Sequence, residues 1–439
     1  MTHTLTYPET AVHDAAGHLV IDGCDLVALA EEFGTPLIVY EEKGLRNQCR
    51  RFVQAFAKRT DDFEIIYASK TFPAIGIAQL IAEEGLSIDV SSGGEYHTAL
   101  VAGVPTERIF FHGNNKTPAE LAYALDHGVG FVVVDSFDEF ELLERMVAER
   151  NGRQRILLRI TPGIEAHTHA YIQTGQEDSK FGFGLAHGLA IEAIRRALAA
   201  PRLELVGLHA HIGSQIFELD AYRATIARLA DLMKQAADEL GFACRYLNVG
   251  GGLGIRYTAE DDPVSIDEYA EVKVAGLHDE MARVGLPIPR ILVEPGRSIV
   301  ATAGVTAYTV GTIKELPGIR TYVSVDGGMS DNIRPMLYQA KYEAALANRM
   351  DDPADATVTI AGKHCESSDV LVRDARLPMP RVGDILVMPA TGAYCYAMAS
   401  NYNGNPRPAV LLVDDAVARV LIARETYADL VAKQHRLED

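Results

Sequence analysis

The chain has 439 residues, 48% of them hydrophobic and 23% charged, which is typical of a soluble globular protein that can bury a large core. A net charge of −19 argues against nucleic acid and anionic membranes as partners, and no apolar run approaches the ~20 residues that span a bilayer. Five scattered cysteines without a Cys-x-x-Cys pair, and an N-terminus without a secretory leader, predict a cytoplasmic protein without a disulfide framework or zinc knuckle.

Predicted strands and helices alternate from about residue 43 to residue 297. The strand-like apolar runs lie near 64–69, 86–90, 108–112, 130–134, 155–160, 204–210, 244–249 and 290–294. The intervals between them carry helices, such as 220–240, and the fifth interval adds a long loop at about 161–186. About eight such units in about 250 residues predict a (β/α)8 barrel of the TIM type. The alternative is a doubly wound open sheet, whose first turn would carry a G-x-G-x-x-G that this chain lacks.

After Arg297 the pattern changes to strands without long helices, which predicts a second, β-rich domain of barrel or sandwich type. Its expected strands are 305–313, 320–326, 356–361, 369–373, 384–388, 409–413 and 417–423, with one short helix at 336–348. Strand candidates at 18–21 and 37–40 extend this domain to the N-terminus, so that it is discontinuous. The expected division is 1–42 for the N-terminal part of the β domain, 43–299 for the barrel and 300–439 for the rest.

Three segments at predicted strand ends carry the chemistry. Lys70 closes the first barrel strand, where loss of solvent would lower its pKa and free the amine for Schiff-base formation; an ordinary surface lysine is the alternative. Gly250–Gly252 follows the seventh strand as a candidate phosphate loop, or simply a tight turn. Glu294 follows the eighth strand, either as a carboxylate for a pyridine nitrogen or as the partner of Arg297. An amine, a phosphate loop and a carboxylate together predict a pyridoxal 5′-phosphate (PLP) enzyme.

Histidines and β-domain clusters are further candidates. His209 and His211 alternate on one strand, so both face the same side. The barrel offers no obvious third histidine, which argues against a metal site. We therefore expect His211 to stack on a cofactor ring and His209 to be a satisfied core residue. The stretch 167–169 in the long loop is expected to form a flap, or otherwise to be solvent-exposed. Clusters at 326–334, 362–369 and 391–394 suggest one shared functional edge in the β domain.

These residues resemble the fold-type III PLP decarboxylases, and within them the diaminopimelate decarboxylases. The matching segments are YASK (67–70), SSGGE (91–95), FHGNNK (111–116), TGQEDSKFGFG (174–184), HAHIGSQ (209–215), NVGGGLGIRY (248–257), EPGR (294–297), VDGGMSDNIRP (325–335), LYQAKYEA (337–344), CESSD (365–369) and TGAY (391–394). They cover the chain in the family's order, and FHGNNK, TGQEDSKFG and CES together are highly specific.

The resemblance implies a PLP-binding barrel and a β domain that work as a homodimer with shared active sites. It assigns Lys70 as the Schiff-base lysine and Cys365 as the proton donor, supplied by the partner subunit. The implied cofactor contacts are Lys70, His211, Ser214, Gly252, Glu294, Pro295, Gly296, Arg297 and Tyr394. The implied substrate contacts are Arg297, Arg334, Tyr338, Glu366 and Tyr394. Asp89 fits less closely and receives no role.

The implied activity is decarboxylation of meso-2,6-diaminopimelate to L-lysine and carbon dioxide, the last step of lysine biosynthesis, without a metal. Three alternatives stay open. One is a decarboxylase of this family that acts on a D-amino acid or a carboxylated polyamine, and another is an amino-acid racemase on the same barrel. The third is an inactive, partner-binding relative, against which the presence of both Lys70 and Cys365 argues.

Overall fold

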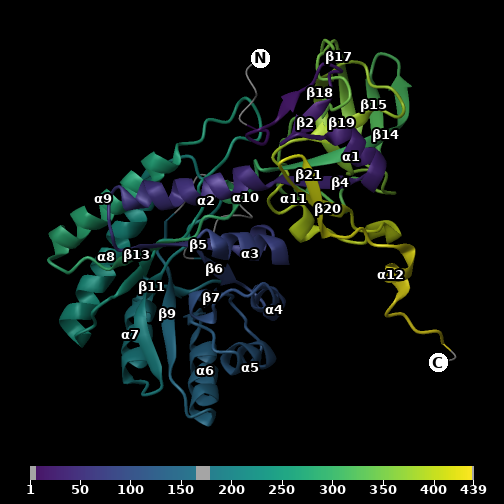
Figure 1. Ribbon diagram of the computed structural model, residues 1–439. Coiled ribbons are helices and arrows are strands. Elements are labelled where there is room, and N and C mark those ends of the chain that lie inside the picture. Colours follow the sequence, from purple (N-terminus) through teal and green to yellow (C-terminus); the bar gives the residue numbers. More distant parts are fainter. Residues whose placement is uncertain (1–5, 165–177, 438–439) are drawn as a thin grey trace. The chain divides into compact units, whose positions relative to one another are not determined.

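The structure, a computed structural model, describes residues 6–164 and 178–437 (Figure 1). The chain divides into two compact units, each described here by itself. The first, called the barrel unit, comprises Gln48–Gly254 and Pro263–Ser298. The second, called the β unit, comprises Met1–Asn47, Ile255–Asp262 and Ile299–Asp439.

The barrel unit contains a closed ring of parallel strands, which confirms the predicted (β/α)8 architecture. The strands are β5 (Phe63–Ala68), β6 (Ser87–Val90), β7 (Ile109–Phe111), β8 (Phe131–Val134), β9 (Gln154–Thr161), β11 (Leu203–His209), β12 (Tyr246–Asn248) and β13 (Arg290–Val293). Each pairs in parallel with its neighbours, and the β13–β5 and β8–β9 pairings close the ring. The strands are almost wholly apolar and buried, as expected for strands that are covered on both faces.

One helix precedes the first barrel strand, and the others follow strands of the barrel. Capping residues fix where several of them begin. They are α2 (Glu42–Ala57), α3 (Ile75–Glu83), α4 (Gly93–Val101), α5 (Pro118–Asp126), α6 (Phe137–Glu149), α7 (Leu189–Ala199), α8 (Asp220–Leu240) and α9 (Ile266–Val284). Thr117 and Ser265 each form a capping box with the glutamate three residues on. The helix predicted at 220–240 is confirmed at both ends.

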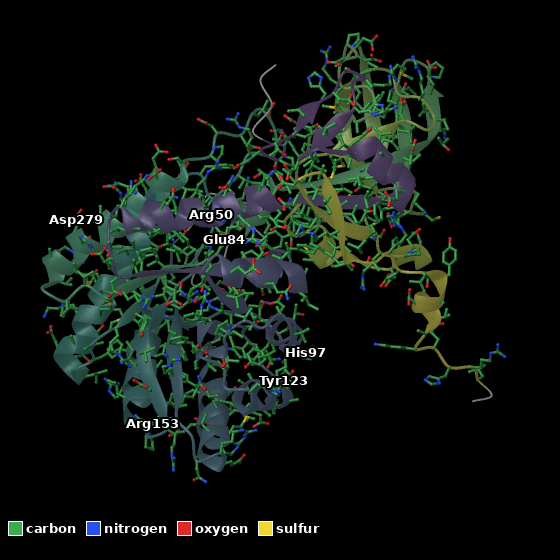
Figure 2. The ribbon with its side chains drawn as sticks, viewed as in Figure 1. Arg50, Glu84, His97, Tyr123, Arg153 and Asp279 are labelled. Atoms are coloured by element: carbon green, nitrogen blue, oxygen red, sulfur yellow. The ribbon has the colours of Figure 1, made fainter. Side chains whose placement is uncertain are left out.

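Polar links join neighbouring helices on the outside of this unit (Figure 2). Arg50 of α2 forms a two-pronged ion pair with Glu84, with Nε and Nη2 each 2.8 Å from a carboxylate oxygen. His97 of α4 lies 2.7 Å from the hydroxyl of Tyr123 on α5. These contacts fix the order of the helices and lie outside the strand ends that carry the candidate site.

The β unit is built on a second sheet, which contains one strand from the N-terminal part of the chain and the others from the C-terminal part. Its strands are β4 (Leu37–Glu41), β14 (Gly304–Leu316), β15 (Arg320–Val325), β16 (Ala345–Leu346), β17 (Ala356–Ala361), β18 (Val370–Leu377), β19 (Ile385–Met388), β20 (Ala409–Asp414) and β21 (Val417–Ile422). The N-terminal strand β4 runs antiparallel to β14 and parallel to β20. The expectation of a discontinuous β-rich domain is therefore confirmed.

Small elements complete the β unit. A three-stranded sheet, β1 (Val12–His13), β2 (Leu19–Ile21) and β3 (Cys24–Asp25), precedes α1 (Leu26–Phe33). The Asp25 side chain caps this helix by accepting from Val27 N. The chain's last helix in the described part is α12 (Tyr427–Val431).

The helix predicted at 336–348 is wrong. The structure has a five-residue helix, α11 (Arg334–Tyr338), and the strand β16 (Ala345–Leu346) follows it. Pro335 is at the start of α11, where its missing N–H costs nothing. Gln339 then takes a left-handed conformation (φ 53°), which ends the helix and turns the chain.

Two further observations bear on the predictions. In the fifth interval the structure has β10 (Phe183–Gly184), which extends the sheet beside β9, and then α7. The histidines at 167 and 169, expected in a flap, lie outside the described residues. Across residues 6–164 and 178–437, no helix combines the length and apolarity that a membrane crossing requires.

Candidate active site

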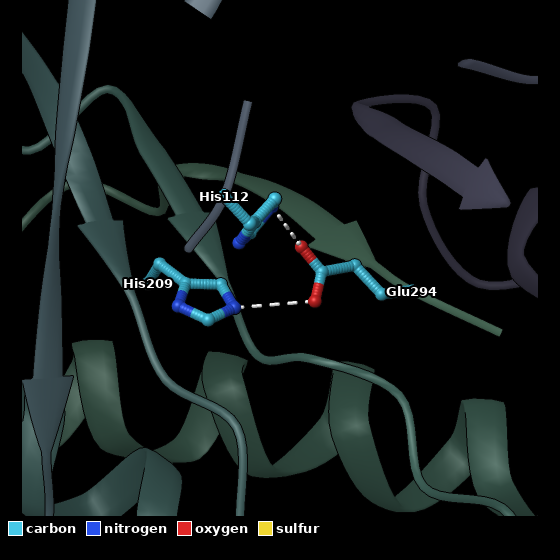
Figure 3. A group of neighbouring side chains, drawn as sticks. All are labelled: His112, His209 and Glu294. Carbon is cyan, nitrogen blue, oxygen red and sulfur yellow. Dashed lines mark hydrogen bonds and ion pairs between the residues drawn. The ribbon is translucent and has the colours of Figure 1, made fainter. Parts of the chain in front are cut away.

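Glu294 is the centre of a buried polar cluster at the ends of four barrel strands (Figure 3). It follows β13, and its Oε2 lies 3.1 Å from Nε2 of His209, the last residue of β11. Its Oε1 accepts a 2.6 Å hydrogen bond from the side-chain amide of Asn248, which ends β12. His112, after β7, has Nε2 3.0 Å from Oε1, within ion-pair distance but off the line of a hydrogen bond. All four side chains are buried.

These neighbours keep Glu294 ionised. Burial acts to raise the pKa of Glu294, but His209 and His112 outweigh it and hold that pKa well below the usual 4.5. Burial lowers the pKa of His112 to about 4, so that ring is neutral near pH 7 and contributes little charge. His209 Nδ1 has no hydrogen-bond partner, so this ring contacts the Glu294 carboxylate through Nε2. Hydrogen bonds from His209 and Asn248 therefore stabilise the anion.

The glycine loop after β12 requires glycine at successive positions. Gly250 has φ 63° and Gly252 has φ 101°, in the left-handed region. A Cβ on Gly250 would lie 2.6 Å from the carbonyl oxygen of Ala210, and one on Gly251 would collide with the carbonyl of Glu294. The loop is thus a tight turn in which the backbone of neighbouring segments approaches closely, and the N–H groups of Gly250 and Gly251 donate to Asn248 and His211.

A fully buried lysine supports this loop from behind. Lys273 of α9 donates 2.9 Å hydrogen bonds to the carbonyl oxygens of Val249 and Gly250. Its ammonium also lies 4.5 Å from the ring centres of Tyr222 and Tyr269, a distance at which aromatic faces attract cations. The carbonyls are therefore held towards the helix.

His211, Ser214 and Arg297 lie around the same loop. Gly251 N donates to His211 Nδ1 (3.3 Å), and Arg297 donates through Nη2 to Ser214 Oγ (3.0 Å). Burial, and next the charge of Lys70, lower the pKa of His211 well below 6.5, so this ring is also neutral. Glu294 itself contacts His209, Asn248 and His112.

Lys70 lies in a single helical turn, Ser69–Thr71, directly after β5. Its side chain is exposed, so the expectation that the strand would bury and desolvate it is wrong for the chain by itself. The turn after the strand points the side chain out, while Ser69 and Thr71 are buried on either side. Its charge nevertheless acts on the pKa of both His211 and Asp89, which places its amine near the cluster.

Gly296 brings the loop after β13 against this turn. A Cβ there would lie 2.6 Å from Cγ2 of Thr71 and 2.8 Å from Cβ of Ala68. Ala68 N donates to the carbonyl oxygen of Pro295 (3.1 Å). The barrel unit therefore brings together every predicted barrel residue: Lys70, His211, Ser214, Gly252, Glu294, Pro295, Gly296 and Arg297.

Sequence reasoning gave no role to several polar residues of this cluster, among them Asn248. Asp89 of β6 is buried, and burial, then Glu294, raise its pKa well above 3.8. Arg159 of β9 has its Nη1 3.7 Å from Oδ2 of Asp135, which directly follows β8. His112 is the third histidine that the chain was expected to lack. His112, His209 and Glu294 each offer a possible metal-ligand atom, and these atoms lie within 4.8 Å of one another. The two histidines already contact the Glu294 carboxylate directly, at 3.0 and 3.1 Å.

A signal for some of these residues was present in the sequence. Asp89 and Arg159 are charged residues inside apolar strands, and His112 directly follows Phe110-Phe111. His209 was expected to be a satisfied core residue; it is buried, but its Nδ1 lacks a partner and its Nε2 faces Glu294. A charged residue or a histidine within or directly after an apolar strand therefore indicates a candidate site residue.

In the β unit, Asp369 ties two of the predicted clusters together. Its carboxylate accepts from His364 N (3.0 Å), from Met329 N (2.8 Å) and lies 2.6 Å from His364 Nδ1. These bonds fix the ends of the loop that carries Cys365 and Glu366. Both of those side chains are exposed, and Cys365 N donates to Asn403 Oδ1 (2.8 Å).

Arg334 is a buried cation without a carboxylate partner among the described residues. It donates to the hydroxyl of Tyr342 and lies 4.7 Å from the ring centre of Tyr257, and its Nε has no hydrogen-bond partner. The Tyr342 hydroxyl lies 3.6 Å from Sγ of Cys395, which follows Tyr394 in the third cluster. A buried guanidinium surrounded by tyrosines has the right charge and donors for an anionic group.

The chain was compared with protein families and solved structures. Residues 43–301 match the model of the pyridoxal-dependent decarboxylase, pyridoxal binding domain. The chain is 50% identical over 422 residues to diaminopimelate decarboxylase of Bacillus subtilis (strain 168), with 96% of each chain covered. It is 47% identical to the enzyme of that name from Staphylococcus aureus (strain COL), with 96% of this chain and 99% of the other covered. The crystal structure of diaminopimelate decarboxylase from M. jannaschii in complex with L-lysine has a TM-score of 0.91 at 34% identity, with 98% of each chain covered.

Proposed function

This chain belongs to the pyridoxal-dependent decarboxylases, and we propose that it decarboxylates meso-2,6-diaminopimelate to L-lysine and carbon dioxide with PLP as its cofactor. The observation that carries the proposal is the buried, ionised Glu294 beside a glycine loop. The names of the relatives and the lysine complex of one of them support the choice of substrate and product.

The barrel unit offers suitable residues for the pyridine nitrogen, the phosphate, the ring face and the aldehyde of PLP. Glu294 is an anion held by two donors, suited to keep a proton on the pyridine nitrogen. The N–H groups around Gly252 and Gly296, with Ser214 and Arg297, suit the phosphate. The neutral ring of His211 suits the face of the pyridine, and the exposed amine of Lys70 can reach an aldehyde. Bound PLP supplies the electron sink into which the scissile bond's electrons pass.

The β unit supplies groups for the substrate. Arg334, with Arg297, suits the distal carboxylate, and Glu366 suits the distal ammonium. Tyr338 and Tyr394 are further proposed contacts of the substrate, and the thiol of Cys365 is the proposed donor of the proton that replaces the lost carboxylate. A substrate without a distal carboxylate would leave the buried Arg334 uncompensated, at a cost of roughly 2–5 kcal/mol.

We further propose that the protein is a cytoplasmic homodimer in which Cys365 and Glu366 act in the partner subunit's site. The exposure of both side chains in the single chain supports this, because a proton donor needs a surface that excludes water. The five free cysteines support a reducing compartment.

A substrate panel tests the function. The purified PLP-loaded protein is assayed for carbon dioxide release from meso-diaminopimelate, L-lysine, D-ornithine and carboxynorspermidine, and for racemisation of alanine and lysine. We expect release from meso-diaminopimelate at least 30-fold above any other substrate, from the ~2 kcal/mol lower bound of the arginine contact. Equal release from D-ornithine or carboxynorspermidine would favour the related decarboxylases, and racemisation without release would favour the racemase.

A further inference from the structure

Asn248 connects two parts of the cofactor site that contact opposite ends of PLP. Its side-chain Nδ2 donates to Glu294 Oε1 (2.6 Å), and its Oδ1 accepts from Gly250 N (2.9 Å). The side chain is fully buried. One amide therefore contacts both the carboxylate meant for the pyridine nitrogen and the first glycine of the phosphate loop.

The orientation of this amide follows from its partners. A reversed amide would put its oxygen against the Glu294 carboxylate and its NH2 against the N–H of Gly250, and both contacts would be repulsive. The donor therefore faces the carboxylate and the acceptor faces the loop. Asn248 is suited to this position because it carries one donor and one acceptor on a short, rigid side chain.

Gly250 is fixed on its other side as well. Its carbonyl oxygen accepts from Lys273 Nζ (2.9 Å) and from Glu294 N (3.2 Å). With its N–H on Asn248 and its carbonyl on Lys273, the first peptide of the loop has little freedom. A displacement of the Glu294 side chain would therefore displace Asn248 and with it Gly250. A displacement of Gly250 would likewise displace the Glu294 side chain.

PLP is a rigid ligand whose pyridine nitrogen and phosphate must meet their partners together. We propose that Asn248 is a positioning residue that fixes Glu294 and the glycine loop at one separation, so that both ends of PLP bind together. The inference rests on the proposed function only in taking PLP as the ligand. The alternative is that Asn248 is an ordinary buried amide that stabilises the fold alone.

The test reverses the hydrogen bond. Asn248→Asp places a carboxylate 2.6 Å from Glu294, so that the pair must share a proton or separate, while the acceptor for Gly250 N is kept. Glu294→Gln added to it returns a donor from the opposite side. Four variants are compared with wild type: Asn248→Asp, Glu294→Gln, the double variant, and Asn348→Asp as the matched control.

Asn348 provides the control because it makes the same pair of contacts in the β unit. Its Nδ2 donates to Asp384 Oδ1 (3.0 Å), and its Oδ1 accepts from Ile385 N (3.1 Å). The readouts are the dissociation constant for PLP, from titration of the apoprotein, and the thermal midpoint of that apoprotein. Neither readout depends on turnover.

We expect Asn248→Asp to weaken PLP binding about 10- to 100-fold at pH 8, and less at pH 6 where the carboxylates share a proton. The double variant should bind PLP at least tenfold more tightly than Asn248→Asp and close to Glu294→Gln. Asn348→Asp should lower only the thermal midpoint. If Asn248→Asp does not fold, the double variant is tested instead. The inference then requires that the double variant folds and binds PLP within tenfold of Glu294→Gln.

Two results would overturn the inference: equal PLP affinity in Asn248→Asp and Asn348→Asp, or purely additive losses in the double variant. Wild-type protein that binds PLP but releases no carbon dioxide would instead overturn the proposed reaction and leave this result standing. Wild-type protein that binds no PLP would overturn the proposed cofactor site itself.

Discussion

The two units differ in how firmly the chain holds its candidate residues. In the barrel unit Glu294, His209 and Asn248 are buried and joined by hydrogen bonds of 2.6–3.1 Å. In the β unit the side chains of Cys365 and Glu366 are exposed on a loop whose ends are held by Asp369 and whose backbone is held at Cys365 N by Asn403. The cluster around Glu294 is thus organised before anything binds, whereas Cys365, if it acts as the proposed proton donor, needs a further surface that excludes water.

Arg334 is the exception within the β unit. It is buried among tyrosines, with no acidic partner in the part of the chain that the structure describes. Burying an unpaired cation costs free energy that a folded protein recovers when an anion binds. Under the proposed function, Arg334 would therefore give the β unit a preference for a carboxylate, although Cys365 and Glu366 are exposed.

The comparison predicts that losing the reactive amine leaves cofactor binding largely intact. Lys70→Ala should reduce carbon dioxide release by about a thousandfold or more, because it removes the covalent link. PLP should still bind through Glu294 and the glycine loop, but borohydride should no longer fix it to the protein. Peptide mapping after reduction is the measurement, with Lys58→Ala, an exposed lysine of α2's C-terminal turn, as the control. Recovery of the reduced adduct on another lysine would contradict the role given to Lys70.

Removing the proposed proton donor should leave stability unchanged and reduce turnover. Cys365 is exposed, so Cys365→Ala should fold normally, yet lower kcat by about 10²–10⁴-fold as a lost general acid does. PLP affinity should not change. A kcat within threefold of wild type would show that another group delivers the proton.

Mixing variants tests whether the exposed groups act in the partner subunit. In a hybrid dimer of Lys70→Ala and Cys365→Ala, both lesions fall in one site and the other stays intact. Random exchange makes half of the dimers hybrids, each with one working site of two, so about a quarter of wild-type activity should return. Subunit exchange is confirmed with a tag on one variant. No recovery after confirmed exchange would mean that each chain builds its own complete site.

Neutralising the buried cation should affect the substrate and spare the cofactor. Arg334→Gln should lower kcat/KM for meso-diaminopimelate roughly 30- to 150-fold, which corresponds to a loss of about 2–3 kcal/mol in binding of the transition state. The affinity for PLP should not change. Arg320→Gln, which removes an arginine that bonds Thr359 in the same unit, is the matched control. Loss of PLP binding in Arg334→Gln, or equal losses in both variants, would argue for a structural role.

The fold could be predicted from the sequence because its signals are local. All eight barrel strands and the longer strands of the β unit appear as strand-like runs in the sequence, and the barrel follows from the number of the former. The two-residue strands β1, β3 and β16 gave no such signal. The helix predicted at 336–348 failed because Gln339 adopts a left-handed conformation that its residue type does not announce. A single backbone angle there decided between helix and turn.

The candidate site was only partly accessible from the sequence. Glycine and strand-end patterns indicated Gly252 and Glu294, since their chemistry is visible in a few neighbouring residues. The roles of His112 and Asn248 depend on contacts that only the closed ring of strands creates. The exposure of Lys70 likewise depends on the turn after β5 and not on the strand itself.

His112, which the sequence did not single out, should affect the pH dependence of stability. His112 is buried among Glu294, His209 and Arg159, and burial, the largest influence, lowers its pKa from 6.5 to about 4. A depressed pKa in the folded state contributes stability that is complete above pH 6.5 and is lost as the pH falls towards 4. From the gap of the two values this loss is at most about 3 kcal/mol in the free energy of unfolding. Denaturant unfolding of the apoprotein at pH 7, 5.5 and 4.5 should therefore show a shallower fall in His112→Gln than in wild type. His278→Gln, at an exposed position on α9, should follow wild type, and parallel curves for all three proteins would mean that His112 is not the buried neutral base of the barrel.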